Sequence, residues 1–221
     1  MTSRQVLAAD PNAGLYYVCT PNNPTGTITP LADIEWLIAN KPAGSKVLID
    51  EAYTHFAGVP VASYLAVKHP DVIVLRTFSK LFGMAGLRMG YIVTNPTNIG
   101  KMMRYDGGMQ SGALPVTSIA CATASLTAAS LIVGRRTQME AARGLTLDYL
   151  KARRVDVKPT HANMFMIDWK TRPARDMQAA FSRKGVEIGR SWAIWPTVSR
   201  ITVGSAEEMK TFCTTLGKII A

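Results

Sequence analysis

The sequence LYYVCTPNNPTG at residues 15–26 joins a short apolar run to a turn-forming segment. Two later runs have the same form, KVLID at 46–50 and VIVLRTF at 72–78. Each run is rich in β-branched or aromatic side chains and is followed at once by polar residues. Short apolar runs of this kind are typical of strands buried in a largely parallel sheet. The first half of the chain therefore predicts an α/β fold.

The segment between the first two runs supports this interpretation. Residues 30–40 place Leu31, Ile34, Leu37 and Ile38 at helical spacing, so strand, helix and strand form a βαβ unit. A fourth candidate strand, LRMGYIV at 87–93, follows a short glycine-containing loop. A short connection of this kind favours an antiparallel direction for that strand.

From about residue 97 the pattern becomes helical, and a second, smaller unit begins near residue 157. The expected elements are helices at 113–132 and 135–154, a strand at 163–169, a helix at 174–184, a strand at 200–203 and a helix capped by Ser205. We therefore expect a larger domain at 1–155, with a mostly parallel sheet and a long connecting helix, and a small α+β domain at 156–221.

Composition narrows the class of protein. The chain has 221 residues, 48% of them hydrophobic and 18% charged, which argues against a disordered or coiled-coil protein. The three cysteines form no CxxC pair and no two histidines lie within ten residues of each other. We therefore expect neither a disulfide framework nor a metal site, and a reducing compartment fits best.

The net charge of +10 raises the question of anionic partners. The densest basic region, 135–158, carries no aromatic ladder and no base-reading motif, so we interpret it as a solvated helix face. Residues 112–134 contain no charge but are rich in Ala, Ser and Thr, which favours a closely packed buried helix over a membrane span. We expect no nucleic-acid or membrane partner, and no leader segment at the start of the chain.

Polar side chains gather where the first three predicted strands end. Because the carboxyl ends of parallel strands meet at one edge of a sheet, ligands bind there in open α/β folds. Taken singly, each of these residues also has an ordinary structural interpretation as a turn, cap or surface residue. The set is Asn23, Asp50, Tyr53, Ser79, Lys80 and Arg88.

As an ordered set, these motifs resemble those of fold-type I pyridoxal-phosphate enzymes, and of class I/II aminotransferases in particular. The similarity is greatest to the histidinol-phosphate aminotransferase group and extends over nearly the whole chain. The motifs are PNNPTG at 21–26, IDEAY at 49–53, TFSKLFGMAGLRMGY at 77–91 and SRITVG at 199–204.

The resemblance implies pyridoxal 5′-phosphate as cofactor and a role for each residue around its ring. Lys80 would form the Schiff base and then transfer the substrate's proton. Asp50 would pair with the pyridine nitrogen, and Asn23 and Tyr53 would hydrogen-bond the ring's 3′ oxygen. Glu51 should point the other way along its strand, so we assign it no catalytic role.

The resemblance also implies binding groups for the anions. Ser79 and Arg88 would bind the cofactor phosphate, and Arg200 would hold the substrate α-carboxylate in a bidentate pair. Arg190 either recognises an acidic or phosphate group of the substrate or makes a surface pair, and the sequence leaves both open.

The chain is shorter than the family's members, and the resemblance implies that an N-terminal part is missing. The expected phosphate-binding loop, the aromatic residue that stacks on the pyridine and a tyrosine given to the partner subunit are not found. We therefore expect this chain alone to be weak or inactive. The family further implies a homodimer in the cytoplasm.

Other functions compete with transamination between an amino donor and a 2-oxo acid. Decarboxylases of amino acid phosphates and carbon–sulfur lyases share the same Asp-Lys-Arg frame. A truncated, non-catalytic relative is a further alternative. The donor also stays open: the basic excess and Arg190 favour a phosphate-bearing amino compound such as histidinol phosphate, while Trp192 and Trp195 favour an aromatic amino acid.

Overall fold

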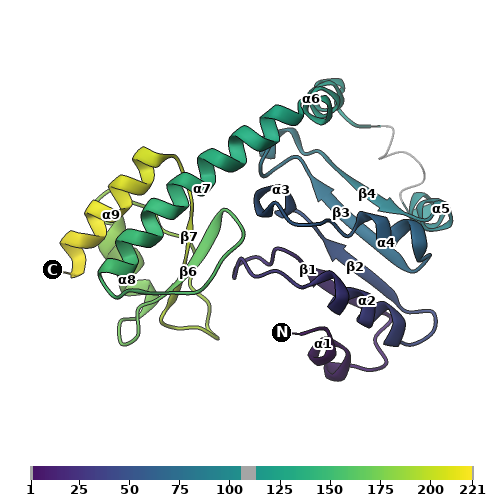
Figure 1. The fold of residues 1–221 in the computed structure, drawn as a ribbon, viewed down its shortest axis with the longest axis horizontal. Helices are drawn as coiled ribbons and strands as arrows, with labels where there is room; N and C mark the ends of the chain where they lie inside the picture. The colour runs from purple at the N-terminus through teal and green to yellow at the C-terminus, as the bar shows by residue number, and fades with distance from the viewer. Residues whose placement is uncertain (1, 106–112, 221) are drawn as a thin grey trace. The chain divides into compact units, whose positions relative to one another are not determined.

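The computed structural model describes residues 2–105 and 113–220, and Figure 1 shows the elements in order. Contacts divide the chain into two compact units. The first, here called the large unit, comprises 1–22 and 28–132; the second, the small unit, comprises 23–27 and 133–221. Most of the long helix α7 (Ala129–Ala152) therefore groups with the small unit. The domain boundary after residue 155 stays a prediction.

A four-stranded sheet forms the centre of the large unit, with the order β1-β2-β3-β4. The first three strands are parallel and β4 runs antiparallel to β3, as the sequence predicts. The strands are β1 (Leu15–Cys19), β2 (Lys46–Asp50), β3 (Val72–Thr77) and β4 (Gly90–Thr94). Because β4 begins at Gly90, the predicted start at residue 87 was wrong.

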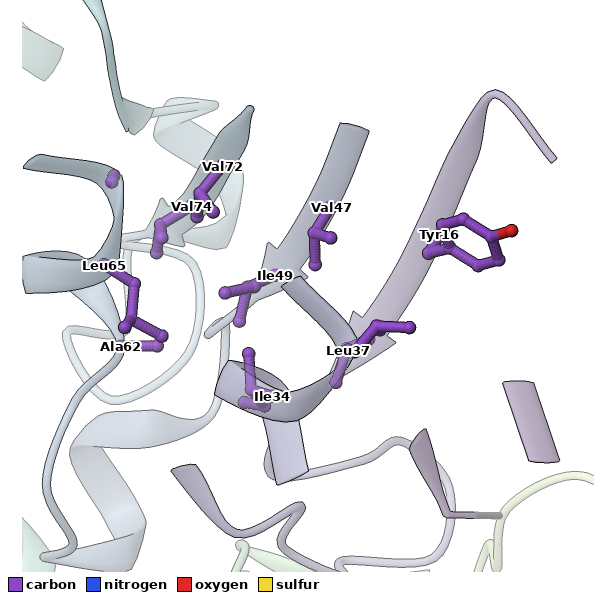
Figure 2. Close-up of a cluster of buried hydrophobic side chains, with 11 residues drawn as sticks. Tyr16, Ile34, Leu37, Val47, Ile49, Ala62, Leu65, Val72 and Val74 are labelled. Carbon is purple, nitrogen blue, oxygen red and sulfur yellow. The ribbon is translucent and has the colours of Figure 1, made fainter. Parts of the chain in front are cut away.

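One face of this sheet packs against helices α2 (Leu31–Asn40) and α4 (Ser63–Lys68). Figure 2 shows Ile34 and Leu37 of α2 pointing at the strands. The short helix α1 (Ser3–Ala9) packs beside α2 and begins with a capping box from Thr2. The cluster consists of Tyr16, Val18, Ile34, Leu37, Val47, Ile49, Ala62, Leu65, Ala66, Val72 and Val74.

The large unit has four further helical elements among the residues that the structure describes. They are α3 (Thr54–Ala57), the 3-10 turn η1 (Ala85–Leu87), α5 (Pro96–Tyr105) and α6 (Val116–Thr127). Helices α1, α3 and α4 and the turn η1 were not predicted, whereas α5 lies where the pattern was predicted to become helical, from about residue 97. The helix predicted at 113–132 is in fact interrupted at Ala128, where α6 ends and α7 begins.

The expectation of a closely packed buried helix in the charge-free stretch was wrong for α6. Only Ser118 and Ala122 are buried, while Val116 is 81% exposed. Absence of charge does not bury a helix whose side chains are mostly small. Residue 112 of that stretch lies outside the described residues. Within the part of the chain that is described, no single helix meets the length and apolarity needed to cross a membrane; α6 and α7 meet them only as a pair, with a bend of 82° at their junction.

The small unit has its own antiparallel sheet, β5-β6-β7, with helices α7, α8 (Ala174–Ser182) and α9 (Ala206–Ile220). Its strands are β5 (Asp156–Val157), β6 (Met164–Asp168) and β7 (Val198–Thr202). Phe181 of α8 stacks on Phe212 of α9 with ring centres 5.2 Å apart. Ser205 caps α9 as predicted: its hydroxyl accepts from the Glu208 N–H at 3.2 Å.

Truncating Leu37 tests the packing of the large unit. This side chain has no exposed surface, so Leu37→Ala leaves a cavity and should lower the free energy of unfolding by about 3 kcal/mol. Urea unfolding followed by circular dichroism measures the change. Val67→Ala is the control, because Val67 is 85% exposed and its removal should cost less than about 0.5 kcal/mol. Equal effects of the two variants would contradict the assigned core.

Candidate active site

The corner after β2 carries the predicted acid and phenol. Asp50 is the last residue of the strand, and Tyr53 lies three residues on, at the N-cap of α3. One oxygen of the Asp50 carboxylate, Oδ1, accepts from the Ala52 N–H at 2.9 Å. The other, Oδ2, accepts from the Tyr17 hydroxyl at 2.6 Å. The carboxylate is therefore held by two donors and keeps lone pairs for a third.

The loop after β3 holds the predicted serine and lysine. The Ser79 N–H donates to the Thr77 hydroxyl oxygen at 3.0 Å, and the two hydroxyls lie 2.9 Å apart. The carbonyl of Lys80 accepts from the Gly83 N–H at 3.0 Å, which closes a tight turn. These bonds define the backbone from which Ser79 and Lys80 project.

Lys80 and Tyr53 are brought together by this loop. The Lys80 ammonium lies 5.4 Å from the centre of the Tyr53 ring, within range of a cation–π contact. Tyr53 is buried at 7% exposure, whereas Lys80 is exposed. The lysine amine therefore reaches from the loop after β3 to the Tyr53 ring on the corner after β2, and it is open to a ligand.

Arg88 lies elsewhere on the same loop. It follows η1 with a φ of 53°, and its guanidinium donates to the Ala85 carbonyl at 2.8 Å. Its hydrogen bond is thus within its own turn. Gly90 then lets β4 approach β3 closely, since a Cβ there would lie 2.7 Å from the Arg76 carbonyl oxygen.

Two predicted residues meet inside the small unit. The segment 23–27 groups with that unit, and the Gly26 carbonyl accepts from the His161 N–H at 2.8 Å. Gly26 has a φ of 71°, and a Cβ there would collide with Thr160. The Arg200 guanidinium donates to the Asn23 amide oxygen at 3.0 Å. Its Nε–H is buried and has no partner among the described residues.

Arg190 is exposed and lies beside the backbone of Arg200. The N–H of the preceding Gly189 donates to the Arg200 carbonyl at 3.0 Å. A Cβ at residue 189 would lie 2.6 Å from that carbonyl oxygen. This close approach requires glycine at residue 189, and it fixes the backbone position immediately before Arg190.

An open depression of about 350 Å³ lies beside the corner after β2. Its lining residues all belong to the large unit and are Asp50, Ala52, Leu75, Arg76, Thr77, Gly90, Tyr91 and Ile92. Asp50 is the one predicted site residue among them. A mainly apolar depression with a few polar groups, at the carboxyl ends of parallel strands, is a suitable place for a small ligand.

Tyr17 is a site residue that sequence reasoning missed. Strand alternation places Tyr17 on the same face as Cys19, and Cys19 is the register partner of Asp50. The pairing of β1 with β2 would have revealed the contact, but register is not visible in one strand read alone. Partial burial, and then the hydrogen bond to Asp50, raise the pKa of Tyr17 well above its usual range.

Comparison with known proteins identifies the family. Residues 5–216 match the model of aminotransferase class I and II, so the chain belongs to this family. It is 32% identical over 209 residues to the histidinol-phosphate aminotransferase of Symbiobacterium thermophilum, covering 93% of this chain and 56% of that protein. It is 34% identical over 168 residues to the aromatic amino acid aminotransferase of Mycobacteroides abscessus, covering 75% of this chain and 48% of that protein.

A solved structure shows the same fold. The crystal structure of a protein from Erwinia carotovora atroseptica, provisionally named histidinol-phosphate aminotransferase, has a TM-score of 0.88 and 31% identity. The match covers 98% of this chain and 62% of that one. The chain thus spans a little over half the length of the curated histidinol-phosphate aminotransferase it matches.

Alkaline titration tests the contact between Tyr17 and Asp50. Since the pKa of Tyr17 is raised, its hydrogen bond adds stability below the ordinary tyrosine value of about 10, and this stability is lost as the pH rises above it. Tyr17→Phe should remove one late-ionising phenol from the ultraviolet tyrosinate titration. Asp50→Asn should lower the pKa only in part, because burial is its largest cause.

Tyr64→Phe is the matched control for this titration. The pKa of Tyr64 is also raised, mainly by its hydrogen bond to Glu35. Its removal should delete a different late phenol and leave the Asp50→Asn effect intact. An unchanged titration curve in Tyr17→Phe would contradict the contact.

Proposed function

We propose that the chain carries the lysine, the acid and the carboxylate-binding arginine of a pyridoxal-phosphate-dependent aminotransferase. The observation that carries this proposal is the exposed Lys80 amine over the Tyr53 ring, at the corner that also holds Asp50. The family match and the relatives named above support it. The reaction transfers an amino group from an amino donor to a 2-oxo acid.

The residues present fit this cofactor by their donor and acceptor chemistry. An exposed primary amine suits an aldehyde, and a carboxylate with free lone pairs suits a protonated ring nitrogen. The Arg88 guanidinium donates one N–H to the Ala85 carbonyl, so most of its five donors remain for a phosphate. Ser79 adds a hydroxyl on the same loop.

Bound pyridoxal phosphate supplies an aldehyde and an electron-poor ring that withdraws electrons from the substrate Cα. The Lys80 Nζ would hold the cofactor, and the same amine would accept and return the proton of the substrate. Asp50 would accept a hydrogen bond from the ring nitrogen and balance its charge. The Tyr17 hydroxyl and the Ala52 N–H keep the Asp50 carboxylate in one orientation.

In the small unit, the Asn23–Arg200 bond leaves defined groups free. The Asn23 oxygen is occupied by Arg200, so its NH₂ group remains as a donor for the cofactor's ring oxygen. The Tyr53 hydroxyl is proposed as the second such donor. The unpartnered Nε–H of Arg200 and its remaining N–H groups suit a bidentate bond to the substrate carboxylate.

For the donor, we propose a phosphate-bearing amino compound like histidinol phosphate. Arg190, exposed and next to the Arg200 backbone, is the candidate for that phosphate. The net charge of +10 favours an anionic substrate in general. An aromatic amino acid is the second candidate, since Trp192 and Trp195 form an edge-to-face pair two residues further on. The homodimer and the cytoplasmic location remain predictions.

Cofactor capture tests the role of Lys80. Titration with pyridoxal phosphate, borohydride reduction and peptide mapping should place close to one adduct per chain on Lys80. Lys80→Arg should abolish it, because guanidinium does not attack the aldehyde at neutral pH. Lys101→Arg, at an exposed lysine of α5, is the control and should change nothing. Scattered labelling of surface lysines would overturn the proposal for this chain.

Two arginine variants test separately whether Arg200 binds the substrate carboxylate and whether Arg190 binds a substrate phosphate. Arg200→Lys loses the planar guanidinium and should weaken the binding of every amino donor about tenfold or more. Arg190→Lys should weaken only phosphate-bearing donors. Donor-induced absorbance changes of the cofactor-loaded chain measure both affinities. If Arg190→Lys weakens the binding of aromatic amino acids and of histidinol phosphate equally, Arg190 does not recognise the phosphate.

A further inference from the structure

Glu51 is a buried carboxylate for which the sequence predicts no function. It follows Asp50 directly, and it is 2% exposed. Its Oε1 accepts from the Ala62 N–H at 2.5 Å, and its backbone N–H donates to the Leu75 carbonyl of β3 at 3.0 Å. A carboxylate so far removed from water is stable only if its charge is matched.

Arg76 supplies the matching charge. Its Nε–H donates to Glu51 Oε2 at 2.8 Å, and its NH2 group lies 2.6 Å from the same oxygen. The NH2 group also donates to the Ser63 hydroxyl at 2.7 Å. The Arg76 side chain is 11% exposed and the Glu51 side chain 2%. The two residues therefore form a nearly dry pair in which both carboxylate oxygens of Glu51 accept hydrogen bonds.

The pair joins the two loops that carry the candidate site. Glu51 stands between Asp50 and Tyr53 on the corner after β2. Arg76 stands one residue before Thr77, which caps the loop leading to Lys80. Each end of the pair is thus within four residues of a proposed catalytic group. Through Ala62 and Ser63 the pair also anchors the start of α4.

A buried ion pair is weak evidence for stability, because desolvation of both charges offsets most of their attraction. The forked geometry of arginine, in contrast, fixes direction as well as distance. The Lys80–Tyr53 contact spans the two loops that this fork joins. The relative placement of Asp50, Tyr53 and Lys80 therefore depends on the pair more than the overall fold does.

We propose that Glu51 and Arg76 are positioning residues that lock the Asp50–Tyr53 corner to the Lys80 loop and so preorganise the cofactor site. This proposal rests on the proposed function only in naming pyridoxal phosphate as the ligand of the preorganised site. The locking itself is a property of the chain without cofactor. Neither side chain is assigned contact with cofactor or substrate.

A double variant separates positioning from stability. Glu51→Gln or Arg76→Met alone leaves one buried charge unpaired, so each should lower the melting temperature markedly. Glu51→Gln combined with Arg76→Met removes both charges and keeps an amide oxygen for the Ala62 N–H. The double variant should therefore regain most of the melting temperature. If positioning matters, its pyridoxal phosphate affinity at Lys80 should still be about tenfold weaker.

Hydrogen exchange gives a readout that needs no cofactor. In the unliganded double variant, peptides covering 50–54 and 77–84 should exchange about tenfold faster than in the wild-type chain. Peptides from β1 and from the small unit should be unchanged. If the double variant does not fold, Arg76→Lys takes its place. This variant keeps the positive charge but loses the planar guanidinium, and the same two peptides should exchange faster.

Asp71→Asn is the matched control. Asp71 pairs with Lys41 at 3.1 Å and with Lys46 at 2.5 Å, at the opposite end of β2 and β3. Breaking these pairs should leave both loops and cofactor affinity unaltered. A double variant with wild-type loop exchange and wild-type affinity would overturn the positioning role. Failure of the wild-type chain to capture the cofactor at Lys80 would instead reject the proposed function, while the exchange result would still decide the role of the pair.

Discussion

The register of the parallel strands is the constraint on which the rest of the large unit depends. Cys19 pairs with Asp50 and Asp50 with Leu75, so β1, β2 and β3 reach their carboxyl ends at one edge of the sheet. A shift of one residue would turn Asp50 toward the helix-covered face and expose Ile49. The apolar contacts of Ile49 with α2 and α4 therefore also determine where the carboxylate lies.

Polar groups at this edge are satisfied by one another. The Tyr17 hydroxyl and the Ala52 N–H donate hydrogen bonds to the Asp50 carboxylate, and the Thr77 hydroxyl oxygen accepts one from the Ser79 N–H. Such contacts orient the groups before a ligand arrives, so less ordering remains to be done on binding. In the small unit the Asn23–Arg200 bond has the same effect, because it directs an amide donor and a guanidinium at once.

The family motifs and the geometry of the site describe different properties of the same residues. The motifs imply a role for each residue, whereas the structure shows which residues are in contact. Lys80 with Tyr53, and Asn23 with Arg200, are contacts found in the structure. Arg88 donates within its own turn to Ala85, so its role toward a phosphate rests on its free donors and on the resemblance.

The sequence by itself determined the elements whose periodicity is strong. The strands predicted at 15–19, 46–50 and 72–78 and the helix predicted within 30–40 correspond to β1, β2, β3 and α2, and β4 has the predicted antiparallel direction. It failed where local pattern carries little information. The short helices α1 and α4 lack a long apolar period, and the exposure of α6 depends on neighbours that its uncharged composition does not specify.

Among the site residues, the sequence singled out those that carry reactive chemistry, since a lysine, an acid and an arginine at strand ends are visible in one dimension. Only the tertiary structure revealed the contacts of Tyr17 with Asp50 and of Glu51 with Arg76. Their partners lie 33 residues away for Tyr17 and 25 for the buried pair. Strand pairing and burial bring such residues together, and neither is encoded in the local order of the chain.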